Sequence, residues 1–174
     1  MAQGLVINVV DAAAPAILNQ VKGQDLKGIL IPFYPVSNRI PALIDVVIKA
    51  ANGPRSIAVL RLWGHGTLEP HPGGQAVLVN DDPGGGFDLE MMLRPSTQAA
   101  LPRLRPYFAP GARVELKHCR VATQAGWDWI SNLAQHWGVE IHASENLQQL
   151  VSWSGTVYSF RAGQKPVKIR GIDP

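Results

Sequence analysis

The chain contains one cysteine, Cys119, and a histidine that stands between two glycines, His65. A thiolate is a strong nucleophile, and a nearby imidazole either accepts the thiol proton or stabilises the thiolate. The two residues therefore suit acyl transfer if folding brings them together across the 54 positions that separate them. The alternative for Cys119 is a structural role, because free cysteine often serves as a small apolar residue in a core.

Each of these residues follows an apolar run that is typical of a β-strand. The run SIAVLRLW covers residues 56–63 and leads into Gly64-His65-Gly66, whereas RVELKH covers residues 113–118 and leads into Cys119. Catalytic groups of parallel α/β sheets gather beyond the carboxyl ends of the strands. We therefore expect the two strands to be parallel neighbours, with His65 and Cys119 at one rim.

The residues next to the pair predict further parts of a site. Gly66 lets the backbone approach a substrate closely, and its N–H is expected to hold a carbonyl oxyanion together with that of Cys119. A helix predicted from Thr123 onward would favour the thiolate through the positive end of its dipole. His118 shares a strand face with Val114 and Leu116, opposite to Cys119, so we expect it to be buried.

Short apolar runs alternate with helical patterns along the chain, which predicts α/β architecture. Further strands are expected at residues 5–10, 27–34 and 139–144, a hairpin of residues 75–80 and 87–93, and a terminal hairpin within residues 156–171. Helices are expected at residues 39–52, within 96–112 and at 123–138. No repeat or linker divides the chain, so we predict a single domain over residues 1–174.

The composition limits the classes of partner. The formal net charge of +3 comes without a long Lys/Arg run, so no nucleic acid is expected. No window approaches the roughly 18 apolar residues that span a bilayer, and no membrane association is expected. The N-terminus lacks the pattern of a signal peptide, which predicts a cytoplasmic protein and leaves signal-independent export open. A single cysteine excludes an internal disulfide.

A strand that ends in His-Gly, followed by a strand that ends at a cysteine and leads into a helix, resembles the caspase–haemoglobinase fold of cysteine peptidases. The caspase signature is Gln-Ala-Cys-(Arg/Gln/Gly)-Gly, with its histidine about 50 residues upstream. In KHCRVA, Cys119 and Arg120 match this signature, while His118 and Val121 replace its alanine and glycine. The following AGWDWISNLAQHWGVEIHAS resembles bacterial relatives, and the similarity spans residues 57–144.

The resemblance implies a three-layer αβα sandwich with a mostly parallel central sheet. It also implies a peptidase with Cys119 as nucleophile, His65 as general base or acid, and the Gly66 backbone as oxyanion donor. The substrate would be a protein or peptide, with self-processing or a few targets as the expected mode, and no cofactor is implied. The departures around Cys119 favour an alternative, a catalytically inactive interaction or scaffold module of the same fold.

Other residues are candidates for binding roles. Trp63, Arg120 and Trp153 are candidates for substrate contact, with core packing as the alternative for the tryptophans. A zinc site of His65, Glu69, His71 and Cys119 uses acceptable ligand types, but its spacing matches no rigid ligand pattern, so no metal is expected. Glu115 and Lys117 share a strand face with Cys119, which requires either charged partners or a strand near a sheet edge.

Overall fold

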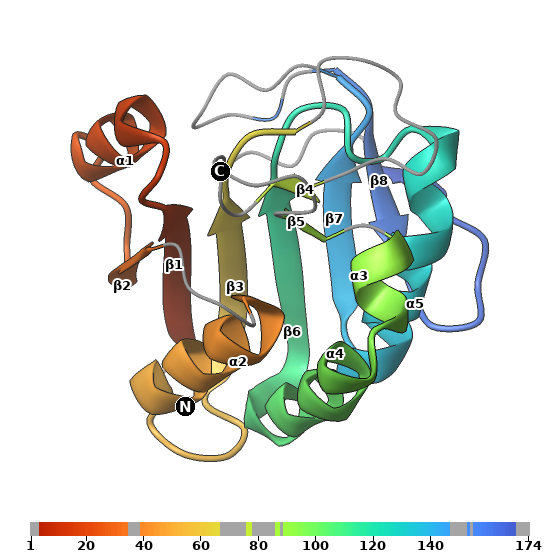
Figure 1. Cartoon of the computed structure of the whole chain (residues 1–174), viewed down its shortest axis with the longest axis horizontal. Helices are drawn as coiled ribbons and strands as arrows, with labels where there is room; N and C mark the ends of the chain where they lie inside the picture. Colours follow the sequence, from red (N-terminus) through yellow and green to blue (C-terminus); the bar gives the residue numbers. More distant parts are fainter. Residues whose placement is uncertain are drawn as a thin grey trace.

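The apolar runs of the sequence assemble into a seven-stranded sheet with the order β2-β1-β3-β6-β7-β8-β9 (Figure 1). The structure is a computed structural model, and it describes residues 4–34, 39–66, 76–77, 86–87, 89–146, 153 and 155–169. The first five strands of this order run parallel, and the last two are antiparallel to their neighbours. The predicted α/β class with a mostly parallel sheet is therefore confirmed.

The strands have the following bounds. The parallel strands are β1 (Leu5–Asp11), β2 (Ile29–Phe33), β3 (Ile57–Trp63), β6 (Phe108–Lys117) and β7 (Glu140–Ser144). The terminal hairpin consists of β8 (Val157–Phe160) and β9 (Val167–Ile169), as predicted. A separate short antiparallel pair is formed by β4 (Ala76–Val77) and β5 (Gly86–Phe87).

The helices connect these strands and cover the sheet. They are α1 (Pro15–Lys22), α2 (Arg39–Ala50), α3 (Leu89–Leu93), α4 (Pro95–Ala100) and α5 (Trp127–Trp137), with the 3-10 segments η1 (Leu101–Tyr107) and η2 (Gln124–Gly126). Gly138 ends α5 in the left-handed conformation, with φ 67°, which is a common helix C-terminus.

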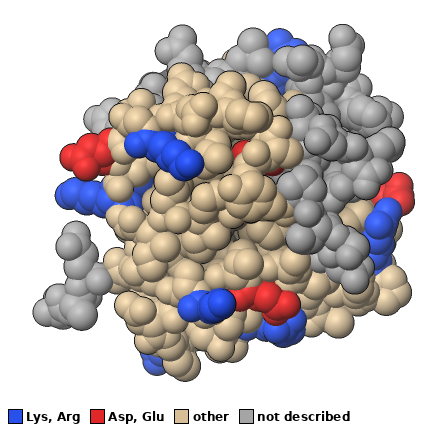
Figure 2. Space-filling model, turned by 60° about the vertical axis from the view of Figure 1, so that its left-hand side comes forward, with Lys and Arg blue, Asp and Glu red and all other residues tan. Residues whose placement is uncertain are grey.

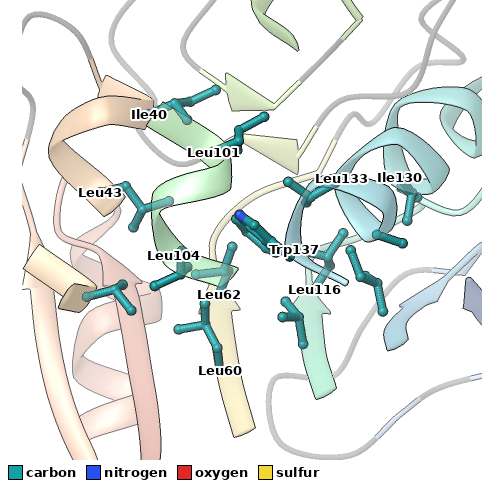
Figure 3. Packing of buried hydrophobic residues seen from close by; sticks show 14 of the residues in the cluster. Ile40, Leu43, Leu60, Leu62, Leu101, Leu104, Leu116, Ile130, Leu133 and Trp137 are labelled. Carbon is teal, nitrogen blue, oxygen red and sulfur yellow. The ribbon is translucent and has the colours of Figure 1, made fainter. Parts of the chain in front are cut away.

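The main core lies between one face of the sheet and the helices α2, η1 and α5 (Figure 3). Alternate residues of the central strands point to this side, and Leu60, Leu62 and Leu116 are fully buried there. The helices contribute the apolar residues Ile40, Leu43, Leu101, Leu104, Ile130, Leu133 and Trp137. This packing fixes β3 and β6 beside each other, and with them the two loops that follow.

The opposite face of the sheet is covered differently. A smaller apolar cluster packs Val10 and Trp63 against α1. Over β6 and β7 the same face carries buried polar residues, including Glu115, Lys117 and His142. The sheet therefore has helices on both faces, and its second face has a buried polar centre beside the cluster under α1.

Two sequence-based predictions are corrected by the structure, and one helix was missed. The second arm of the central hairpin is only β5, because residues 89–93 form α3. The α5 helix begins at Trp127 rather than near Thr123, after the 3-10 turn η2. Helix α1 was not predicted. Its buried residues Ile17, Leu18 and Val21 pack against the sheet.

The distribution of charged side chains and the lengths of the helices are relevant to nucleic-acid and membrane partners. Figure 2 brings forward the side of the molecule that carries α1, and the described charged side chains there form small separated groups on a largely uncharged surface. No helix within the described ranges is long and apolar enough to cross a lipid bilayer.

Candidate functional site at the ends of β3 and β6

The two strands that lead to His65 and Cys119 are parallel neighbours, as predicted, and their arrowheads lie side by side in Figure 1. The last pair in their register is Trp63 with Lys117. His65 follows the first of these residues by two positions, and Cys119 follows the second by two. The sheet therefore delivers both residues to the same rim, where His65 is exposed and Cys119 is half-buried.

Gly66 brings the two loops into direct backbone contact. A Cβ added at this position would lie 1.6 Å from the carbonyl oxygen of Cys119 and 2.5 Å from its carbonyl carbon. Such distances are far inside any van der Waals contact, so only glycine fits here. The sequence suggested that Gly66 permits close approach to a substrate, whereas the observed close approach is to the backbone of Cys119.

The loop that carries Cys119 is also held on its other side, by the end of β7. The backbone N–H of Arg120 donates to the carbonyl of Asn146 at 3.0 Å, and that of Ala122 donates to the carbonyl of Ser144 at 3.0 Å. The buried hydroxyl of Ser144 donates to the carbonyl of Thr156 and accepts from the N–H of Asn146. Cys119 thus lies in a loop fixed between β3 and β7.

Ser144 was not singled out from the sequence as a positioning residue. Its signal was a small hydroxyl residue at the end of an apolar strand, where a buried polar group needs partners.

Arg120, which was singled out for substrate contact, is exposed and adopts a left-handed backbone with φ 53°. His118 is fully buried, as predicted.

Lys117 lies between two tryptophans beneath this rim. Its ammonium nitrogen is 3.8 Å from the ring centroid of Trp153 and 5.6 Å from that of Trp63. A cation over an aromatic face is attracted by the ring quadrupole. Trp153 is half-buried, so part of its surface stays accessible next to the site.

Trp63 takes the packing role rather than the cleft-lining role. Only 1% of its surface is exposed, and it packs in the apolar cluster under α1. Its indole N–H donates to the side-chain oxygen of Asn8 at 3.3 Å. The proposed direct contact of Trp63 with substrate is therefore corrected: its ring supports Lys117 from below.

The charged centre of β6 has the partners that the sequence requires, because Glu115 joins two arginines. Arg61 donates from Nε to one carboxylate oxygen at 2.9 Å, and Arg113 donates from Nε to the other at 2.8 Å. Burial raises the pKa of Glu115, but the charge and hydrogen bond of Arg61, then Arg113 and Lys117, hold it below its ordinary value. This pairing explains how a central strand carries Glu115.

Burial likewise controls Lys117. It lowers the pKa of this ammonium group to about 8, with Arg61 and Arg113 acting in the same direction and Glu115 opposing them. The group remains mostly protonated at neutral pH and releases its proton in mildly alkaline solution. The rim below Cys119 therefore carries a positive charge at neutral pH.

We predict that Lys117→Met changes the pH dependence of stability. Between about pH 8 and 10.5 the folded protein has released this proton while the unfolded chain still holds it, so the free energy of unfolding of the wild type rises with pH. Relative to the variant, the rise should reach at most about 3 kcal/mol. Urea unfolding at several pH values measures it, and a wild-type–variant difference that stays constant across this window would contradict the assignment.

No group of three or more metal-ligating side chains occurs within the described parts of the chain. Two members of the zinc alternative, Glu69 and His71, lie outside those parts. The other two members, His65 and Cys119, are the residues that the resemblance to peptidases implies as catalytic.

Comparison with known proteins adds no assignment to this geometry. The chain showed no significant match to protein-family models, to curated proteins or to solved structures.

Proposed function

We propose that this chain is a cysteine peptidase-like hydrolase in which Cys119 is the nucleophile and His65 the general base. The observation that supports the proposal best is the contact between Gly66 and the backbone of Cys119 at the ends of two adjacent parallel strands. A caspase-like arrangement of the sheet is part of the same proposal. It is supported by the strand order and by the positions of His65 and Cys119 after β3 and β6.

The proposed reaction is hydrolysis of a peptide bond in two steps. His65 accepts the thiol proton, the Cys119 sulfur bonds to the substrate carbonyl carbon, and the backbone N–H groups of Gly66 and Cys119 hold the oxyanion. His65 then gives the proton to the leaving amine as the C–N bond breaks. Water hydrolyses the resulting thioester and regenerates the thiol. This scheme needs neither a metal nor an organic cofactor.

The substrate in this scheme is a protein or peptide, and self-processing is one form of it. Arg120 is exposed one residue after the nucleophile, and Trp153 is half-buried beside Lys117. Both are proposed to contact the substrate. Ser144 and Asn146 are proposed to position the loop of Cys119 through the backbone bonds described above.

Alkylation of the only cysteine tests the dyad without knowledge of the substrate. We predict that native Cys119 reacts with iodoacetamide near neutral pH and that His65→Ala slows the reaction by about tenfold, because the thiolate loses its partner. His136→Ala removes a half-buried histidine from α5 and should leave the rate unchanged. Because the chain has one cysteine, the intact mass reports the modified site directly.

The outcomes separate the proposal from its alternative. A thiol that reacts only after unfolding, or a rate that is the same with and without His65, would contradict the dyad and favour the inactive interaction module. Hydrolysis is then measured on peptide libraries and on the purified chain itself. Cys119→Ala should lower any cleavage rate by at least about 10³-fold.

A further inference from the structure

A hollow lies at the end of the sheet opposite to Cys119, where β6 and β7 begin. Its volume is about 610 Å³, within the range of small-molecule sites. It is lined by apolar residues from β6 and the end of α5, among them Phe108 and Trp137, and by three arginines. None of its lining residues belongs to the candidate catalytic rim, so a role for this hollow does not depend on the proposed function.

An irregularity of β6 shapes one wall of the hollow. In the pairing of β3 with β6, Ile57 lies opposite Phe108 and Val59 lies opposite Arg113. Residues 109–112 therefore have only Ala58 opposite them and depart from the regular ladder. All four of these residues line the hollow.

The three arginines reach the hollow from separate segments. Arg55 lies in the turn before β3, Arg105 lies in η1, and Arg161 follows β8. All three are exposed. Three guanidinium groups from different directions can surround a tetrahedral group with several charged oxygens, whereas a planar carboxylate matches a single guanidinium fork.

Neighbouring negative charge offsets only part of this positive charge. Arg161 donates to Oε2 of Glu140 at 2.9 Å, and Glu140 also accepts hydrogen bonds from His142 and Ser159. Arg105 lies over the end of α5, since a Cβ at Gly138 would be 2.9 Å from its Nε. A helix end carries only about half an elementary negative charge. Arg55 forms no ion pair with any residue that the structure describes.

We propose that this hollow binds a small molecule bearing two or more linked phosphate groups, held by Arg55, Arg105 and Arg161. Phe108 and Trp137 are almost fully buried, so their rings offer little face on which a base could stack. Recognition thus depends on the phosphate oxygens. A smaller adjoining hollow of about 80 Å³ shares Glu140 and Arg161 and adds Lys165, which extends the basic surface in that direction.

Tripolyphosphate is a suitable probe, with binding to the full chain measured by calorimetry at low ionic strength. We expect saturable binding that weakens about tenfold in Arg105→Gln and again in Arg55→Gln, because each loses charge-assisted hydrogen bonds. Arg103→Gln is the matched control. It removes the same charge two residues away in η1, from an exposed side chain that pairs with Asp45 and does not line the hollow.

Each result decides the proposal. A loss of at least tenfold in Arg105→Gln with less than a twofold change in Arg103→Gln supports the site. Equal weakening by both variants, or no saturable binding, overturns it. Citrate should bind at least tenfold more weakly than tripolyphosphate, and equal binding overturns the phosphate assignment. The melting temperature of each variant without ligand verifies that it is folded.

Discussion

Glu115→Gln should lower the free energy of unfolding by about 3–5 kcal/mol, because it removes the carboxylate that two arginines share inside the sheet. The carboxylate side chain is only 3% exposed and its partner Arg61 only 14%. Arg113 is 37% exposed and can turn toward water, but Arg61 would keep its charge in a buried position. Urea unfolding at neutral pH measures the loss.

The acid dependence gives this prediction a second, independent readout. The pKa of Glu115 in the folded protein lies below its ordinary value, so the ionised carboxylate stabilises the fold. This stabilisation is complete at pH values above the ordinary pKa of a glutamate. The stabilisation is lost as the pH falls through the lower, folded pKa. The gap between wild type and Glu115→Gln should therefore narrow in acid.

The matched control for this variant is Glu90→Gln. Glu90 pairs with Arg94 at 3.1 Å on the surface, where the carboxylate side chain is 83% exposed. Removing its charge should cost less than about 0.5 kcal/mol. If Glu115→Gln costs no more than this control, the buried cluster contributes nothing to stability and the argument from burial is wrong.

The positions of the two strand ends could be predicted because they depend on local patterns. The near-continuous apolar run of β3 indicates a strand covered on both faces, whereas β6 is predicted as a strand from the shorter run RVELKH despite the charges of Glu115 and Lys117. Once both strands belong to a parallel sheet, the residues after them lie at one rim whatever the loops do. His65 and Cys119 therefore follow from pattern and topology, although 54 positions separate them.

The partners of the charged residues could not be predicted in the same way. Glu115 and Lys117 were recognised as misplaced on a covered strand, but Arg61 became a partner only through the register of β3 with β6. The contact of Trp153 with Lys117 likewise follows from no periodicity of the sequence. Such contacts depend on tertiary geometry rather than on spacing along the chain.

The missed elements have physical causes of the same kind. Helix α1 spans only eight residues and begins at Pro15, so its apolar pattern is too short to separate from a loop. Residues 89–93 carry an apolar run that suits either a strand or a helix, and packing decides for α3. The hollow near Arg55 and Arg105 depends on the irregular pairing of β6 with β3, and no sequence motif predicts this irregularity.

Gly66→Ala should disrupt the candidate site. Gly66 does not adopt the left-handed conformation, so an alanine backbone is permitted there. The obstacle is steric: the new Cβ would lie 1.6 Å from the carbonyl oxygen of Cys119, which is backbone and has no rotamer to change. The two loops must then separate, with a loss of stability of about 3 kcal/mol.

Two measurements test this separation. The melting temperature reports the loss of stability, and Gly23→Ala is its control, because Gly23 has φ −75° and a Cβ there would keep an ordinary 3.4 Å contact with the carbonyl of Asn19. The alkylation rate of Cys119 reports the site: in the Gly66→Ala background, His65→Ala should no longer slow the reaction. A variant as stable as wild type, with the His65 effect intact, would mean that the close backbone contact does not hold the two loops together. The reactivity of Cys119 would then not depend on its backbone contact with Gly66.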